Sequence, residues 1–231
     1  MSDETPRVLN HFAGYAFSDN FWALGGKERA SKARALFGAL GDASGVQNFY
    51  QVYPAVDGVD FLVWAASKIQ HADDTAEFFE HYARAVNPHR AWLQPTGSLW
   101  GYTGKSDYSK SDSAQTVDPF NGPRRKYLVV YPFVKTIDWY LLGRDARQGM
   151  MTEHIRLGKG YRAIRQLLLY SFGLQDQEFV VVYEMDDLPL FSELVHELRS
   201  TEARRYTERD APLQTAIYRP IDDLLRLWSE S

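Results

Sequence analysis

The chain has 231 residues, a formal net charge of −4 and a hydrophobic content of 45%. These values are typical of a globular protein that is long enough for one large domain or two small ones. The net negative charge gives no reason to expect nucleic acid as a partner, because that ligand needs a basic face. No apolar run approaches the roughly 20 residues that a membrane-spanning helix requires.

The chain contains no cysteine, which excludes disulfides, thiolate-bound metals and a cysteine nucleophile. Its first residues, MSDETPRVLNHF, are polar and acidic and do not have the pattern of a secretory signal. We therefore expect a cytoplasmic protein. Aromatic residues make up 14% of the chain, which indicates either a large aromatic core or a pocket for a flat, conjugated ligand.

An internal repeat organises the chain, because residues 10–86 and 126–204 follow the same pattern. Residues 15–17 (YAF) match residues 131–133 (YPF), for example. Each copy predicts a strand, a helix, two strands and a second helix. The second helices begin at pairs of aspartates, at 73–74 and 186–187, which suit helix N-termini.

A further strand is predicted near the end of each copy, at residues 90–93 and 213–218. The order strand, helix, strand, strand, helix, strand is the ferredoxin-like unit. The predicted fold class is therefore α+β, with two tandem ferredoxin-like repeats forming a dimeric α/β-barrel-like domain. A short amphipathic helix at residues 221–228 could cover the barrel or an oligomer contact.

The predicted organisation has three parts, with an N-terminal repeat at 1–94, a connecting loop at 95–123 and a C-terminal repeat at 124–231. The loop is rich in Ser, Gly, Asp and Lys, and residues 104–118 have almost no apolar side chains. This composition predicts a mobile segment. A lid over a site is the functional alternative to a plain linker.

His154 differs from the other five histidines by its context. It lies on a predicted helix with Met150, Met151, Leu157 and Gly158 at neighbouring helical positions, a stripe that would face the sheet. The corresponding helix of the first copy has no histidine. No two histidines have the spacing of a metal-binding pair. The pattern leaves two interpretations, an iron ligand or a histidine of the core.

Several segments of the second half match one known superfamily in the same order: 131–135 (YPFVK), 139–141 (WYL), 151–154 (MTEH), 160–161 (GY), 173–179 (GLQDQEF) and 198–206 (LRSTEARRY). On these segments the chain resembles the chlorite dismutase superfamily, and within it the coproheme decarboxylases of bacterial haem synthesis. The doubled ferredoxin-like layout extends the resemblance to the first half.

The resemblance implies roles for four residues. His154 matches the proximal iron ligand, and Tyr131 matches the tyrosine whose radical takes hydrogen from a propionate side chain. Trp139 matches a pocket tryptophan at the porphyrin edge, and Lys135 matches a basic residue that holds a propionate. Charge-assisted bonds suit such a ligand.

Further residues are weaker candidates for the same site. The arginines that could bind propionates are Arg124, Arg125, Arg204 and Arg205. Glu202 could accept a hydrogen bond from His154 and orient its ring.

For the function, the resemblance implies peroxide-dependent decarboxylation of iron-coproporphyrin III (coproheme) to haem b. Coproheme and hydrogen peroxide would then be the small-molecule partners, and the protein a homopentamer, with ferrochelatase as a further partner. Chlorite dismutases carry a distal arginine thirteen residues after the proximal histidine, and that position here is Leu167, beside Arg165 and Gln166. This difference, together with Tyr131, argues against chlorite decomposition.

The resemblance leaves alternatives for the residue that acts on the distal side of the haem pocket. Some coproheme decarboxylases have a glutamine at the Leu167 position, and others use a histidine before the YPF strand, where this chain has Ser113, Ala114 and Gln115. A chlorite dismutase or other haem peroxidase is the second functional hypothesis. The third is a non-catalytic ferredoxin-like binding module in which His154 is a core residue.

Overall fold

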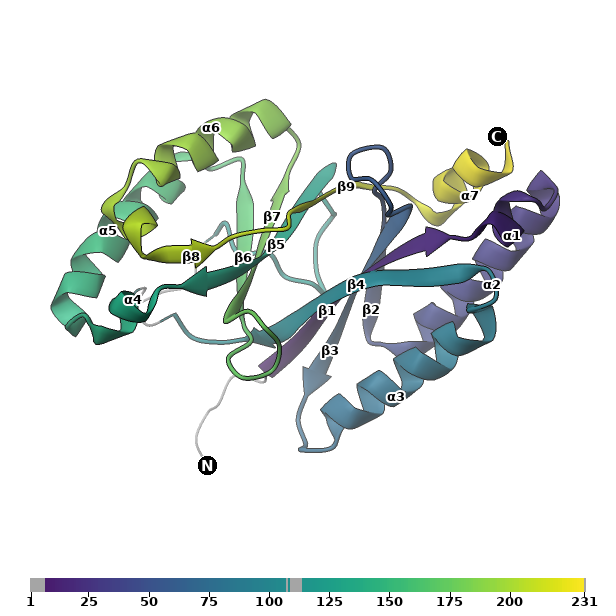
Figure 1. The fold of residues 1–231 in the computed structure, drawn as a ribbon, viewed down its shortest axis with the longest axis horizontal. Coiled ribbons are helices and arrows are strands. Elements are labelled where there is room, and N and C mark those ends of the chain that lie inside the picture. Colours follow the sequence, from purple (N-terminus) through teal and green to yellow (C-terminus); the bar gives the residue numbers. More distant parts are fainter. Residues whose placement is uncertain (1–6, 107, 109–113, 231) are drawn as a thin grey trace.

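The computed structural model describes residues 7–106, 108 and 114–230. The two repeats lie side by side, with strands at the centre and helices on the outside (Figure 1). The elements of the first repeat are β1 (Arg7–Phe17), α1 (Asp19–Trp22), α2 (Gly26–Ala43), β2 (Val46–Gln51), β3 (Phe61–Ile69), α3 (Asp74–Val86), η1 (Asn87–His89) and β4 (Leu93–Thr103). Those that follow are β5 (Tyr127–Lys135), α4 (Ile137–Leu141), α5 (Arg144–Gly160), β6 (Arg165–Tyr170), β7 (Phe179–Met185), α6 (Leu188–Arg199), η2 (Glu202–Tyr206), β8 (Thr207–Arg209), β9 (Gln214–Tyr218) and α7 (Ile221–Ser229).

Each repeat has the strand order of a ferredoxin-like sheet, β4-β1-β3-β2 in the first and β6-β7-β5-β9 in the second. All of these pairs are antiparallel. The two sheets are joined at both edges, because β2 pairs with β9 and β4 pairs with β6. The pairings of these eight strands therefore run around a closed ring, and β8 adds to β5. The predicted pair of ferredoxin-like repeats is confirmed.

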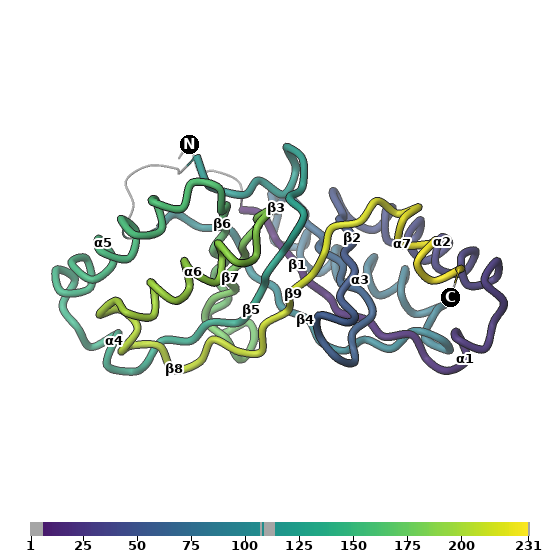
Figure 2. The backbone as a smooth tube through the Cα atoms, turned by 90° about the horizontal axis from the view of Figure 1, so that it is seen from above, coloured from purple at the N-terminus to yellow at the C-terminus, as the bar shows by residue number. Residues whose placement is uncertain are grey.

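Apolar side chains of the described residues form three clusters. One lies between the two repeats and takes residues from both, including Phe12, Tyr50 and Trp64 from the first and Leu128 and Val182 from the second. A second cluster packs the first sheet against α2, α3 and α7, and a third packs the second sheet against α5 and α6. Figure 2 shows the two groups of helices on opposite sides of the central strands.

The C-terminal helix α7 belongs structurally to the first repeat. The helix predicted at 221–228 is present, and its Leu224, Leu225 and Trp228 are buried in the core of the first repeat. Arg34 on α2 donates to Asp222 at 2.8 Å. The prediction that 124–231 is one domain is therefore wrong at its end, since the chain returns through β9 to cover α2.

The predicted connecting loop is also wrong at its start. Residues 93–103 form β4, which pairs with β1 and β6, whereas residues 90–92, predicted as a strand, precede it. Pro95 and Gly97 resemble loop residues in sequence but flank a bulge in β4 opposite Gly14 and Tyr15, a place where a strand accepts proline. Gly101 has another function, because a Cβ there would lie 2.7 Å from the carbonyl oxygen of Tyr170 on β6.

The end of the predicted loop is tied down as well. Thr116 pairs with Gln166 at the start of β6, and Val117 is 1% exposed. Gln115 Nε2 donates to the carbonyls of Tyr161 at 2.9 Å and Ile164 at 3.0 Å, just after α5. Its side chain thus fixes the end of the helix that carries His154. Residues 107 and 109–113, which include Ser113, lie outside the described residues.

Both aspartate pairs lie at helix starts, but the N-cap residue Asp73 makes no side-chain cap bond to α3, whereas Asp187 caps α6. Asp187 accepts from the backbone N–H of Leu190 at 3.1 Å and caps α6. Asp74 accepts from the N–H groups of Gln70 at 2.7 Å and His71 at 2.9 Å. In the part of the chain that the structure describes, no helix is long and apolar enough to cross a membrane.

Candidate functional site

One face of the second sheet is only partly covered. Residues directly opposite each other on neighbouring strands point to the same face of a sheet. The register of β5, β7 and β6 therefore puts six apolar or aromatic side chains on one face, in the rows Tyr131–Val181–Leu168 and Phe133–Phe179–Tyr170. Leu168 is 42% exposed, and the other five are half-buried. We call these six residues the open face.

The opposite face of the same strands is closed. Its rows, one residue further along, include Val130–Val182–Leu167, and all three side chains are buried in the cluster between the repeats. The prediction that Leu167 lines the cofactor pocket is therefore wrong. The thirteen residues from His154 to Leu167 include the end of α5 and the turn before β6, where the spacing between relatives can differ by one residue. In a strand, a shift of one residue moves a side chain to the opposite face of the sheet. Leu168 is the residue of this pair that lies on the open face.

Tyr131, a predicted catalytic residue, lies on the open face. Its ring stacks on Tyr183 with centroids 6.3 Å apart, and the two hydroxyl groups are hydrogen-bonded. Burial, followed by the charge and hydrogen bond of Tyr183, raises the pKa of Tyr131 well above its ordinary value. Tyr131 is therefore a neutral phenol at physiological pH. The sequence analysis did not identify Tyr183. It lies two residues after Val181 on β7, so its side chain is on the same face of the sheet.

Lys135 and Trp139 lie together at the end of β5. Lys135 is 9% exposed and Trp139 is 3% exposed. The Lys135 ammonium lies 4.2 Å from the centroid of the Trp139 ring and donates to the carbonyl of Ala203 at 3.3 Å. Burial lowers the pKa of Lys135 to about 8, so the side chain is still charged at neutral pH. The structure thus brings together two of the predicted catalytic residues.

Glu178, which the sequence did not single out, connects β5 to α4. Its carboxylate accepts from the backbone N–H of Lys135 at 2.8 Å and from the hydroxyl of Tyr140 at 2.5 Å. Burial first, and then this hydrogen bond, raises the pKa of Tyr140. The short helix that carries Trp139 is therefore fixed to the end of the sheet.

His154 lies on α5 and is half-buried. Its Nδ1 is buried and has no hydrogen-bond partner among the described residues. Burial, and then the positive charge of Lys135, lower the pKa of His154 to about 4. Its imidazole is therefore neutral at physiological pH, the form that binds a metal. The influence of Lys135 also shows that the two predicted site residues are close in space.

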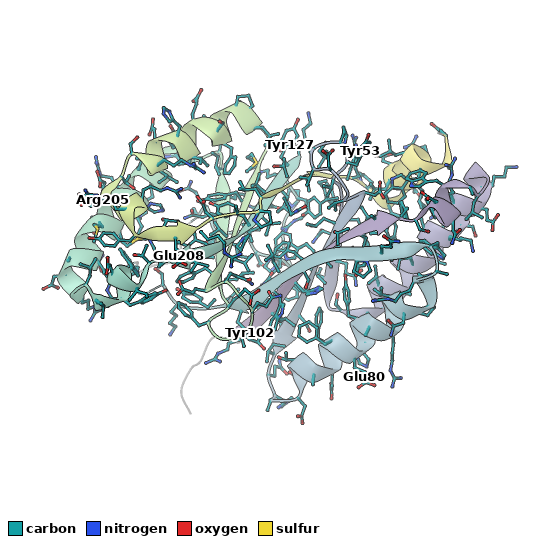
Figure 3. The ribbon with its side chains drawn as sticks, viewed as in Figure 1. Tyr53, Glu80, Tyr102, Tyr127, Arg205 and Glu208 are labelled. Carbon is teal, nitrogen blue, oxygen red and sulfur yellow. The ribbon has the colours of Figure 1, made fainter. Side chains whose placement is uncertain are left out.

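Glu202 does not orient His154 in this structure. Its exposed carboxylate accepts from Arg205 at 3.3 Å, within the same short helix η2. Arg205 lies at the periphery of the C-terminal repeat (Figure 3). Both predictions, Glu202 as an acceptor for His154 and Arg205 as a propionate ligand, assumed side chains that turn inward.

Arg124 is buried on the other side of the sheet. Its side chain is 4% exposed, lies 3.5 Å from Glu184 and stacks at 5.1 Å on Trp64 of the first repeat. It also donates to the carbonyl of Asp118 at 2.7 Å. The prediction that Arg124 binds a propionate is wrong, because its guanidinium group already contacts Glu184 of the second repeat and Trp64 of the first. Arg125 pairs with Asp186 on the surface at 2.7 Å.

Arg204 is the one predicted arginine that lies near the site. It is half-buried and donates to Asp210 at 2.5 Å. Its positive charge contributes, after burial, to lowering the pKa of Lys135. Arg204 and Lys135 therefore form a region of positive charge between η2 and β5.

These residues fit a haem-type group. The open face offers an apolar and aromatic surface on the side of the sheet that packs against α5. This helix carries a neutral imidazole whose Nδ1 has no partner among the described residues. Lys135 and Arg204 supply positive charge for carboxylates at the rim. His154 would hold the iron, and these cations would hold the acidic side chains.

The fold is that of a doubled ferredoxin-like protein, and the residues of the candidate site would suit a flat, anionic ligand. The family model for chlorite dismutase matches residues 27–219. The chain therefore belongs to the chlorite dismutase family, whose members are haem enzymes.

Curated and solved relatives agree with this assignment. The chain is 28% identical over 185 residues to the coproheme decarboxylase of Mycolicibacterium smegmatis, which covers 78% of this chain and 76% of that protein. A variant of the chlorite dismutase from Candidatus Nitrospira defluvii superposes with a TM-score of 0.80 at 23% identity, over 96% of this chain and 95% of that one. The imidazole complex of the same enzyme gives a TM-score of 0.79 at 23% identity, with the same coverage. At these identities the solved structures establish the fold.

Proposed function

We propose that the protein removes two propionate side chains of iron-coproporphyrin III, with hydrogen peroxide as the oxidant, to give haem b. For each side chain, one propionate, one proton and one peroxide give one vinyl group, one carbon dioxide and two water molecules. Tyr131 carries the proposal, since it is a neutral phenol on the open face, on the strand that ends in Lys135. The curated relative from Mycolicibacterium smegmatis supports the choice of reaction.

The chain's own residues would divide the work as follows. His154 would hold the iron, and when bound the iron supplies the reaction with peroxide. Lys135 would fix a propionate by a charge-assisted bond, and Trp139 keeps its ammonium in place. Tyr131 can release an electron and its phenolic proton together, which converts it into a hydrogen-atom acceptor for the propionate chain. Arg204 would bind a second carboxylate if Asp210 gave way.

The direct test is the mass of the porphyrin. The purified protein is loaded with iron-coproporphyrin III, treated with hydrogen peroxide and extracted for mass spectrometry. We expect the masses of the mono- and then the di-decarboxylated products. An unchanged porphyrin mass, under conditions that bleach the pigment, would contradict the proposal.

Chlorite decomposition is the alternative function, since it is the activity named for the solved relatives of the same fold. The side chains of β6 on the same side as the open face are Gln166, Leu168 and Tyr170, whereas Arg165 pairs with the buried Glu184 at 3.7 Å. No arginine of β6, a strand that the structure describes throughout, therefore faces the proposed ligand. Rapid oxygen release from chlorite without bleaching would favour this alternative.

A non-catalytic binding module is the remaining hypothesis, and a His154→Ala variant with an unchanged porphyrin spectrum would support it. The family resemblance also leads us to propose a homopentamer in the cytoplasm, with ferrochelatase as a partner. Light scattering on the purified protein tests the assembly.

A further inference from the structure

Arg147 shares a helix face with His154. It lies on α5, seven residues before the histidine. Seven residues are close to two turns of an α-helix and correspond to a rise of about 10 Å. The two side chains therefore point to the same side of α5, at a separation on the order of that between the centre of a porphyrin and a carboxylate on its rim.

Arg147 also lacks an acceptor among the described residues. The residue is half-buried, its Nε is buried without a hydrogen bond, and its side chain has no ion pair in the part of the chain that the structure describes. A nitrogen of Arg29 and one of Arg124 are also buried without a hydrogen bond, but Arg124 has Glu184 at 3.5 Å and Arg29 lies over the Trp22 ring. Arg147 has no such ion-pair partner among the described residues. A buried charged donor without an acceptor is costly. A carboxylate of a ligand would supply the acceptor that this Nε lacks among the described residues.

The surroundings of Arg147 place it at the rim of the open face. Its positive charge opposes the rise in the pKa of Tyr140 that burial and Glu178 cause, so its guanidinium lies near that phenol. The ring centroids of Tyr140 and Phe172 are 6.3 Å apart, and those of Phe172 and Phe179, a residue of the open face, are 4.8 Å apart. A ligand lying on the open face would therefore reach Arg147 with an acidic group on its edge.

We propose that Arg147 binds a carboxylate of the porphyrin substrate and helps the site select porphyrins with acidic side chains. The proposal rests on the proposed function, because it assumes that the ligand on the open face is a carboxylated porphyrin. The guanidinium matches a carboxylate with two parallel N–H donors. Lys135 and Arg147 would then hold two different carboxylates, one near the end of β5 and one near the start of α5.

The test uses metal-free coproporphyrin III, so that the bond between iron and His154 plays no part. Its fluorescence is titrated with the wild-type protein and with the Arg147→Gln, Arg147→Lys and Arg144→Gln variants. Arg144 is the matched control because it is exposed at the first residue of the same helix. Circular dichroism establishes that each variant is folded.

We expect Arg147→Gln to weaken binding by about 10-fold or more, because the charged hydrogen bonds to the carboxylate are lost. Arg147→Lys should lose less, and Arg144→Gln should stay within about twofold of wild type. With the tetramethyl ester of coproporphyrin in the same detergent buffer, wild type and Arg147→Gln should bind equally, because the ester has no carboxylates.

Equal affinities of Arg147→Gln and Arg144→Gln for coproporphyrin would overturn the proposal. An equally large loss with the ester would also overturn it, because the effect would then not depend on carboxylates. A failure of the proposed function has a different signature. In that case the wild-type protein would bind coproporphyrin with the Arg147 dependence, yet leave the mass of the iron complex unchanged after peroxide.

Discussion

The two repeats share one topology but differ in what lies between sheet and helices. In the first repeat aromatic rings fill this space. Phe17 stacks on Phe21 with ring centroids 3.8 Å apart, and the ring of Trp228 on α7 packs edge-on against Phe17 with centroids 4.8 Å apart. In the second repeat the open face is left partly uncovered, with Leu168 42% exposed. The space in the first repeat is thus filled by its own side chains, whereas the open face of the second repeat is exposed to the proposed ligand.

The same residue types have different surroundings in the two repeats. Tyr15 of the first repeat corresponds to Tyr131, and its hydroxyl meets that of Tyr82 at 3.1 Å, as Tyr131 meets Tyr183. His11 is enclosed by rings, with Tyr82 at 4.8 Å, and burial lowers its pKa to about 4, as for His154. A buried tyrosine and a neutral histidine therefore do not define the site. The access of a ligand to them does.

The two tyrosines give the largest expected contrast. Tyr131→Phe should lower the rate of decarboxylation by about 1,000-fold or more, equivalent to about 4 kcal/mol, because the hydrogen-atom acceptor is lost. Tyr15→Phe should leave the rate unchanged and cost about 1 kcal/mol of stability, the value of one hydrogen bond. Product analysis and urea unfolding measure the two effects. Comparable rates for the two variants would remove the distinction between the repeats.

The adjacent residues Leu167 and Leu168 test the assignment of the faces. Leu167→Ala should lower the free energy of unfolding by about 3 kcal/mol, because it leaves a cavity in the core between the repeats. Leu168→Ala should cost less than about 1 kcal/mol and should weaken porphyrin binding instead. Urea unfolding and porphyrin titration separate the two outcomes. The reverse pattern would mean that β6 is turned by one residue.

The pH dependence of stability tests His11 as a core residue. Burial lowers its pKa to about 4 in the folded protein, whereas an unperturbed histidine has a pKa of 6.5. Between these values the unfolded chain binds a proton that the folded chain does not, so stability falls as the pH drops from 6.5 towards 4. At pH 4.5 this loss is about 2.5 kcal/mol.

The variant His11→Leu should lose that much less stability on acidification than wild type, as measured by urea unfolding at pH 7 and 4.5. Its iron-porphyrin spectrum should stay unchanged, whereas His154→Ala should alter the spectrum. An altered spectrum in His11→Leu would place a ligand in the first repeat.

The smallest expected effect concerns Lys135. Its pKa of about 8 means that the ammonium loses its proton above that pH, and a carboxylate ligand binds the protonated form. The affinity for metal-free coproporphyrin III should therefore fall by about fivefold between pH 8 and 9, or about 1 kcal/mol. Lys135→Met should bind more weakly at pH 7 and lose this pH dependence. A parallel pH profile in the variant would exclude Lys135 as the titrating group.

Much of the architecture was predictable because it depends on local patterns. The strand YLVVYPFVK, the helix that carries His154 and the helix starting after Asp187 all lie where apolar periodicity and capping residues put them. The repeat itself predicted two ferredoxin-like units. Pro95 and Gly97 misled the prediction of a loop, because the bulge that accommodates them exists only when β4 pairs with β1.

The candidate site was predictable only in part. Tyr131, Lys135, Trp139 and His154 were identified from their motifs, and the structure brings Lys135, Trp139 and His154 close together. Arg147 could have been found, because it lies seven residues before His154 on the same helix. The roles of Glu178 and Tyr183 could not be predicted, since they depend on contacts with β5 and α4, which are distant in the sequence.

The sequence by itself determined the doubled α+β fold, the histidine on the first long helix of the second repeat and the tyrosine of the YPF strand. These features follow from periodicity and residue type, which are local properties of the chain. Only the tertiary structure decided that Leu168 and not Leu167 lies on the open face, that Arg124 is used between the repeats, and that Glu202 turns outward. Such choices depend on strand register and on charges distant in sequence, and a shift of one residue reverses them.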